Sequence, residues 1–239
     1  MSELNDLREA ILRLPLVQRA VLADWIAEVT RSEGEGAVAQ ARGAYLPAEP
    51  LMTLEEYFAY EAGRIERHEY LNGTLYAMSG ASVAHNQIMF QVAQALSVRL
   101  QDGPCRVFLA DLKLRLALGE DQIVYYPDVM VTCQPERWGR DFISAPRLVV
   151  EVLSPSTRHI DLREKALNYR RESAIEDYLI LSQDECCARV HRRTQQWGAE
   201  QLAGAEALLA LPSLGISLPL GELYAGVSLG ARGRVRASW

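Results

Sequence analysis

Two acidic residues inside strongly apolar segments are the residues of this chain whose types and spacing point most directly to chemistry. Asp128 lies in QIVYYPDVMVT over 122–132, and Glu151 lies in LVVEVL over 148–153. An ionised carboxylate is costly in apolar surroundings unless it is paired or bound to a metal. Because the spacing suits two neighbouring strands joined by a loop, we expect the two side chains to form a site for a divalent cation.

Such a pair of acids is suited to the hydrolysis of phosphate esters. Carboxylate oxygens are the ligands that Mg²⁺ prefers, and Mg²⁺ usually keeps several waters that can attack a phosphodiester. The alternative is that each acid only pairs with a basic residue or caps a turn. Two acids in consecutive apolar segments, with Lys113 and Lys165 available, favour a functional site with Mg²⁺ as cofactor and Mn²⁺ as a substitute.

The composition limits the class of protein. Hydrophobic residues make up 49% and charged residues 23% of the 239 residues, as in ordinary soluble globular proteins. No stretch approaches the roughly 18 unbroken apolar residues of a membrane helix. The first residues, with Glu3, Asp6 and Glu9, lack the basic and then apolar pattern of a secretory signal. We therefore expect a cytoplasmic protein without a membrane segment.

Charge and cysteine content exclude further classes. A formal net charge of −6 argues against a chain that coats nucleic acid by bulk electrostatics, although a local basic patch remains compatible with it. The cysteines contain no Cys-x-x-Cys pair, so we expect neither a zinc site nor a disulfide framework. They are Cys105, Cys133, Cys186 and Cys187.

The chain divides into four predicted parts. Residues 1–30 have apolar residues at spacings of three and four with a break near Pro15, which predicts a helical hairpin extension. Residues 31–50 are rich in Gly, Ala, Glu and Pro without periodicity and read as a linker. The main domain is expected over 51–228, followed by a basic tail over 229–239.

The main domain is predicted to be a mixed α/β domain. The expected elements are a helix near 54–62, a hairpin of 68–71 and 74–78 about Asn72-Gly73, a helix from Ser82 to about 100, strands 106–118, 122–132 and 147–153, a helix over 160–172, strands 178–181 and 188–192, and short strands near 200–218. In the strand over 106–118, Asp111 and Lys113 would point the same way. Pro127 is unusual inside a strand because proline cannot donate to a ladder.

At these residues the sequence resembles the PD-(D/E)XK nuclease superfamily, and within it the Uma family of candidate restriction endonucleases. The resembling segments are MTLEEY at 52–57, HEYLNG at 68–73, SGAS at 79–82 with HN at 85–86, YPD at 126–128, EVLSPST at 151–157, DLREKALNY at 161–169, LPSLG at 211–215 and ELY at 222–224. The resemblance implies a restriction-endonuclease-like core, a central mixed β-sheet flanked by helices. It also implies a metal-dependent endonuclease acting on DNA, with Asp128 and Glu151 as metal ligands and a lysine that positions water.

The chain departs from the superfamily pattern where the lysine should stand. Leu153 occupies that position, and leucine cannot orient water. Lys165 lies in the Asp-x-x-x-Lys-x-x-x-Tyr segment that matches the family, while Lys113 lies on a strand, where side chains are held rigidly. The resemblance suggests Glu69 as a third metal ligand or as a partner of the lysine.

Two functions follow from this sequence. The first is a metal-dependent endodeoxyribonuclease with a relocated lysine. The second is a catalytically impaired nuclease-derived domain that binds nucleic acid or a protein partner, which Leu153 would favour. A homodimer is plausible, because cutting both DNA strands needs two sites and the extension over 1–30 offers apolar surface.

Overall fold

The structure covers most of the predicted main domain. The computed structural model describes Ile11 and residues 52–78, 80–154, 157–158 and 160–229. The predicted extension and linker, apart from Ile11, and the tail, apart from Leu229, lie outside the described residues, so the domain boundaries stay a prediction. No helix among the described residues is long and apolar enough to cross a membrane.

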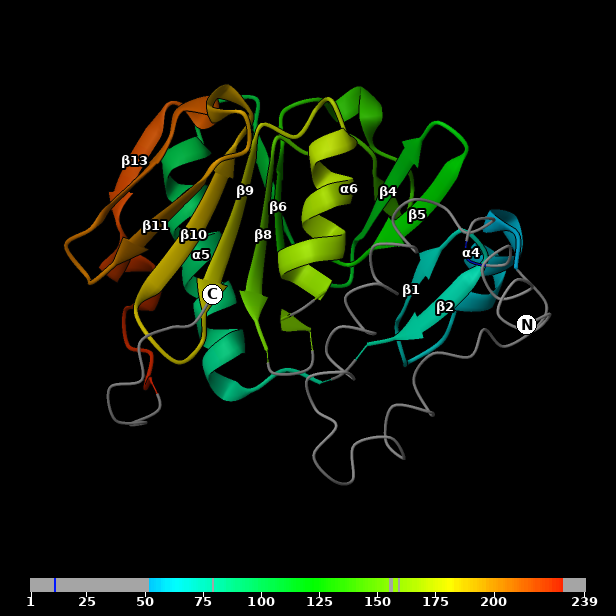
Figure 1. Cartoon of the computed structure of the whole chain (residues 1–239), viewed down its shortest axis with the longest axis horizontal. Helices are drawn as coiled ribbons and strands as arrows, with labels where there is room; N and C mark the ends of the chain where they lie inside the picture. Colours follow the sequence, from blue (N-terminus) through cyan, green and yellow to red (C-terminus); the bar gives the residue numbers. More distant parts are fainter. Residues whose placement is uncertain (1–10, 12–51, 79, 155–156, 159, 230–239) are drawn as a thin grey trace, which may run out of the picture. The chain divides into compact units, whose positions relative to one another are not determined.

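Two mixed β-sheets form the main domain (Figure 1). The five-stranded sheet has the order β2-β1-β5-β4-β7 and the six-stranded sheet the order β11-β10-β9-β8-β6-β3. The first contains β1 (His68–Leu71), β2 (Thr74–Ala77), β4 (Lys113–Leu118), β5 (Asp121–Tyr125) and β7 (Phe142–Ile143). The second contains β3 (Arg106–Leu109), β6 (Val129–Thr132), β8 (Leu148–Leu153), β9 (Asp177–Ser182), β10 (Cys187–Arg192) and β11 (Ala199–Ala203). Only the pairs β8 with β9 and β4 with β7 are parallel among the described strands, which makes both sheets mixed.

Helices cover both faces of the six-stranded sheet. Figure 1 shows α6 (Ala166–Arg171) in front of this sheet and α5 (Val83–Leu100) behind it. Every residue of β8 is buried, as its nearly continuous apolar run predicts. Alternate residues of β8 pack against α5, while those between them, including Leu153, pack with Tyr169 of α6. The side chain of Glu151 lies on the face of the six-stranded sheet that α6 covers, where it contacts Tyr169. On this face the six-stranded sheet adjoins the five-stranded sheet. A short hairpin of β12 (Leu208–Leu211) and β13 (Ile216–Pro219) completes the domain.

Local sequence signals fix the first helix and hairpin. Helix α4 (Leu54–Glu61) begins after Thr53, whose hydroxyl accepts a hydrogen bond from the Glu56 backbone N–H, while the Glu56 carboxylate accepts one from the Thr53 N–H. This is the predicted capping box. Between β1 and β2, Asn72 and Gly73 have φ angles of 48° and 99°, as a tight hairpin turn requires. Both predictions are confirmed.

The prediction of two long, continuous strands over 106–118 and 122–132 is wrong. Each is broken and contributes to both sheets, the first at Asp111, whose φ is 77°, and the second at Pro127. Proline cannot donate to a ladder, which explains why β5 ends before it. The two breaks lie together, because the Ala110 N–H donates to the Asp128 carbonyl at 3.0 Å. Asp128 therefore stands where the chain passes between the sheets.

A disulfide joins Cys105 and Cys133, contrary to the sequence-based expectation. These residues flank β3 and β6, whose antiparallel register pairs Arg106 with Thr132. One further step along the ladder places the two cysteines opposite each other. Cysteine spacing alone could not reveal this pairing, because it depends on which strands are neighbours.

Candidate active site

The structure brings Asp128 and Glu151 side by side. Val129 pairs with Val150 between β6 and β8, so the next step of the register places the two acids opposite each other. The Asp128 N–H donates to Glu151 Oε2 at 3.4 Å. The Val152 N–H donates to Asp128 Oδ2 at 2.7 Å. Backbone groups therefore hold the two predicted metal ligands together where β6 begins and β8 ends.

Lys165 reaches these acids from the helix that follows β8. The predicted helix over 160–172 begins as a π-helical turn, Ile160–Lys165, and continues as α6; such turns often occur at functional sites. The Lys165 Nζ lies 2.9 Å from Glu69 Oε1, 3.1 Å from Glu151 Oε1 and 3.3 Å from Asp161 Oδ1. With only 4% of its surface exposed, Lys165 is a buried cation enclosed by three carboxylates. We call Glu69, Asp128, Glu151, Asp161 and Lys165 the carboxylate cluster.

Glu69 belongs to this cluster as the partner of the lysine. It lies on β1 of the five-stranded sheet and is almost buried. Its Oε1 also accepts a hydrogen bond from the Tyr126 N–H at 3.3 Å. The candidate site is therefore built by both sheets and lies at their junction.

Lys113 is placed differently. It begins β4, and its Nζ lies 5.4 Å from the centre of the Tyr126 ring. Burial lowers its pKa, and the charges that act on it most strongly after burial are those of Glu61 and Arg67, which lie outside the carboxylate cluster. The break at Asp111 explains the difference, because it places β4 in the five-stranded sheet. Of the two candidate lysines, Lys165 therefore lies in the carboxylate cluster and Lys113 does not.

Three further residues join the site. His85 Nε2 lies 3.2 Å from Asp128 Oδ2, and Tyr169 Oη donates to Glu151 Oε1 at 2.9 Å. The third is Asp161, which is already counted in the carboxylate cluster and was not among the predicted site residues. Asp161, Lys165 and Tyr169 follow one another at spacing four, which places them on one stripe of a helix, and this signal could have found Asp161 and Tyr169. For His85 the signal was weaker: it lies in a segment that resembles the family, but a single histidine after the helix cap Ser82 has no partner in the sequence.

The cluster contains more acids than cations. Burial raises the pKa of Glu151 well above its usual value; Lys165 opposes this shift, and the neighbouring carboxylates add to it. Burial lowers the pKa of Lys165, but the carboxylates around it outweigh burial and hold its pKa well above the usual range. Lys165 is therefore protonated at neutral pH. The pKa of His85 is raised, because Asp128 outweighs the lowering effect of burial.

This donor set fits a hard divalent cation. Among the described residues, no three His, Cys, Asp or Glu side chains gather closely enough to hold a metal by themselves. Asp128 and Glu151 supply two carboxylates, and Mg²⁺ is typically bound by one or two carboxylates together with waters. Burial is the main reason why the pKa of Glu151 is raised, and the neighbouring carboxylates add to it; a bound cation would favour the ionised form of Glu151.

A second buried polar network lies beside the cluster. Tyr125 Oη donates to Glu164 Oε1 at 2.9 Å, and Asn168 Nδ2 donates to Tyr125 Oη at 2.6 Å. Burial raises the pKa of Glu164 to about 7. Because Lys165 follows Glu164 directly, this network helps to fix the π-helical turn.

Glu164 should make the protein less stable as the pH rises. Its folded pKa of about 7 exceeds the ordinary value of 4.5, so folding favours the protonated form. This contribution to stability is fully present below pH 4.5 and is lost as the pH rises to about 7. We expect Glu164→Gln to remove this part of the pH dependence, measured as free energy of unfolding in urea at several pH values. Parallel curves for wild type and variant would contradict the assignment.

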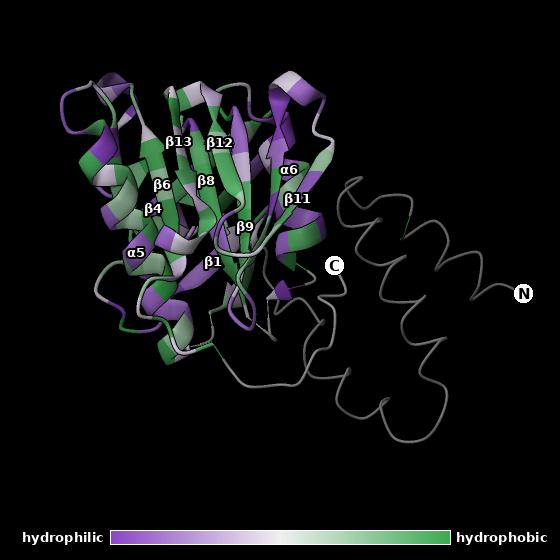
Figure 2. Ribbon diagram, turned by 90° about the vertical axis from the view of Figure 1, so that its left-hand side faces the viewer, coloured by the Kyte–Doolittle hydropathy of each residue, from purple (hydrophilic) through white to green (hydrophobic). Residues whose placement is uncertain are grey.

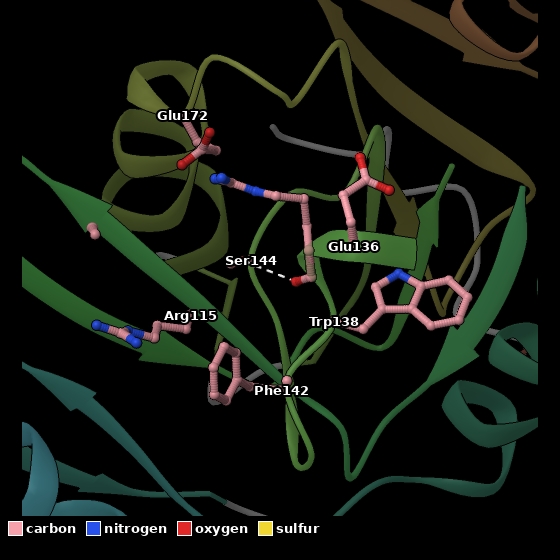
Figure 3. Close-up of a pocket in the computed structure, with 9 residues that line it drawn as sticks. Arg115, Glu136, Trp138, Phe142, Ser144 and Glu172 are labelled. Carbon is pink, nitrogen blue, oxygen red and sulfur yellow. Dashed lines mark hydrogen bonds between the residues drawn. The ribbon is translucent and has the colours of Figure 1, made fainter. Parts of the chain in front are cut away.

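One hollow of the surface lies away from this cluster. It has a volume of about 370 Å³ and is lined by side chains that include Arg115, Trp138, Phe142 and Glu172 (Figure 3). None of its lining residues belongs to the carboxylate cluster. We place the chemistry at the cluster, because perturbed acids and a buried lysine indicate catalysis more strongly than a hollow does.

Comparison with known proteins gives a family match and two related proteins. Residues 54–221 match the model of the Uma2 family, described as “Putative restriction endonuclease”. An uncharacterised protein of Synechocystis sp. is 33% identical over 190 residues, covering 77% of this chain and 98% of that protein. Another from the same organism is 29% identical over 164 residues, covering 66% and 90%.

A solved structure shows the same fold. The crystal structure of “a putative nuclease belonging to DUF820” from Anabaena variabilis has a TM-score of 0.60 and 21% sequence identity with this chain. The match covers 73% of this chain and 98% of that one. The predicted fold class, a restriction-endonuclease-like core of mixed sheet flanked by helices, is confirmed.

Proposed function

The chain belongs to the Uma2 family, and from this membership and the carboxylate cluster we propose that it is a metal-dependent endonuclease that hydrolyses DNA phosphodiester bonds. The observation that carries the proposal is the contact of Lys165 Nζ with Glu151 Oε1 at 3.1 Å. In this chain Leu153 occupies the position where the superfamily pattern has a lysine. Through this contact Lys165 brings an ammonium group to the acids from another position. The resemblance to the PD-(D/E)XK superfamily implies both kinds of group, two acids and a lysine.

Asp128 and Glu151 would hold the cation, with Mg²⁺ as the natural ion and Mn²⁺ as a substitute. When bound, it would offset charge on the scissile phosphate and make a nearby water more acidic. Glu151 is fixed for this task by Tyr169 and Lys165 on Oε1, so that Oε2 faces Asp128. The protein thereby orients both carboxylates before any substrate arrives.

Lys165 acts in this proposal as a positive hydrogen-bond donor. Its pKa is held well above the usual range by the surrounding acids, so it cannot take a proton from water at neutral pH. Its three N–H donors face Glu69, Glu151 and Asp161, so in this proposal one of them turns to the attacking water when substrate binds and offsets the charge that develops on the phosphate. Glu69 and Asp161 keep the ammonium group in place.

The test is DNA cleavage by the full chain with Mg²⁺ or Mn²⁺, paired with calorimetric titration of each metal. We expect nicked or linear products from circular DNA, complete inhibition by a chelator, and metal binding without DNA. Metal-independent cleavage, or no cleavage and no metal binding, would contradict the proposal. The latter result would favour the non-catalytic domain suggested by Leu153.

A further inference from the structure

One face of α5 is exposed although it is rich in apolar side chains. The inner face of this 18-residue helix packs against the six-stranded sheet through Ile88, Val92 and Leu96. Figure 2 shows α5 at the outer edge of the domain, beyond the strands. Eight residues of α5 are exposed. Three of them are Asn86, Ser97 and Arg99, and the other five follow the helical repeat along one stripe: Val83, Gln87, Phe90, Gln94 and Val98. We call these five residues the α5 stripe.

The α5 stripe is uncharged. The whole helix contains no acidic residue and one arginine, Arg99, which is paired with Glu222 at 2.7 Å. Its apolar members are prominently exposed, Val83 by 77%, Phe90 by 58% and Val98 by 59%. A surface that lacks charged residues and carries aromatic and aliphatic side chains is typical of the centre of a protein interface. Contact with DNA phosphates would need lysine or arginine instead.

The order of residues in the stripe indicates the partner. Valine, glutamine, phenylalanine, glutamine and valine read the same in both directions. A two-fold axis through Phe90 would pack two copies of α5 antiparallel, with Val83 against the partner's Val98 and Gln87 against the partner's Gln94. Two Phe90 rings would meet at the axis. Each glutamine amide carries donors and an acceptor, so the facing amides can pair.

We propose that the α5 stripe is the contact surface of a homodimer of this chain. A two-fold interface must be self-complementary, which the palindromic stripe satisfies. Two chains of net charge −6 repel each other, and this uncharged face lets them meet without placing like charges together. The inference is independent of the proposed nuclease activity.

The size of the stripe predicts a reversible dimer. An 18-residue helix is about 27 Å long and about 10 Å wide, which gives roughly 300 Å² per copy. A stable interface usually buries about 800 Å² per partner. We therefore expect association that depends on protein concentration.

Sedimentation velocity of the full chain over a concentration series tests this proposal. Wild type should shift from monomer to dimer as the concentration rises. Phe90→Glu and Phe90→Lys should each raise the dissociation constant at least about tenfold, because like charges would meet at the axis. An equimolar mixture of the two variants should recover dimer, since opposite charges then face each other.

Leu208→Glu is the matched control. Leu208 is exposed to the same extent as Phe90, 58%, but lies on β12 and should leave the dissociation constant unchanged. All variants should keep the wild-type thermal unfolding midpoint at a protein concentration at which wild type is monomeric. A monomer at every concentration, or a dimer that both Phe90 variants leave intact, would overturn the proposal. A dimer that the variant mixture fails to restore would exclude the two-fold contact at Phe90.

Discussion

Asp128→Asn is expected to reduce metal-dependent DNA cleavage by about a thousandfold or more while the fold stays intact. Charge stabilisation by a metal supplies several kcal/mol at the transition state, and each 1.36 kcal/mol is about tenfold in rate. Asparagine keeps the size of the side chain and an oxygen for the Val152 N–H, which now donates to Asp128 Oδ2. The loss should therefore come from the missing negative charge. Initial rates of plasmid nicking at saturating Mg²⁺ measure it.

Asp102→Asn provides the control, because Asp102 is an exposed acid in the turn after α5. It should cleave like wild type. Calorimetry should show that Asp128→Asn also loses metal affinity. Equal cleavage by wild type and Asp128→Asn would exclude Asp128 as a metal ligand.

Lys165→Met should abolish cleavage and also destabilise the protein at neutral pH by about 3–5 kcal/mol. The variant leaves Glu69, Glu151 and Asp161 buried without the ammonium group that they share. Because protonation neutralises these acids, the loss of stability should shrink as the pH falls. Urea unfolding at several pH values measures this effect, and nicking assays measure activity.

Lys113→Met is the matched control for this variant. Lys113 is half-buried on β4, and its strongest charge contacts lie outside the carboxylate cluster. We expect a stability change of about 1 kcal/mol or less and near wild-type cleavage. The reverse result, with Lys113→Met inactive and Lys165→Met active, would assign the catalytic lysine to position 113.

Elements with strong local signals were predictable from the sequence. Thr53 and Glu56 carry a capping box, and Asn72-Gly73 can supply the positive φ angles of a tight turn. The strongly apolar segment around Glu151 indicated a buried strand, and β8 is buried throughout. Each of these features depends on residues close together in the chain, so a pattern was enough.

Apart from the side-by-side placement of Asp128 and Glu151, the features that depend on which strands are neighbours were not predictable. Apolar alternation continues through Asp111 and Pro127, so it could not show that the chain changes sheets there. For the same reason the sequence left Lys113 and Lys165 as alternatives, and it missed the Cys105–Cys133 disulfide. His85 reaches Asp128 only because α5 begins near the strand ends where both acids lie.

The most direct test of the carboxylate cluster is a crystal of the protein soaked with Mn²⁺ and measured for anomalous scattering. The account predicts an anomalous peak about 2.0–2.3 Å from one oxygen each of Asp128 and Glu151, with Lys165 Nζ still beside Glu151. A metal bound at other side chains, or no metal in crystals of a protein that cleaves DNA with Mn²⁺ in solution, would contradict it.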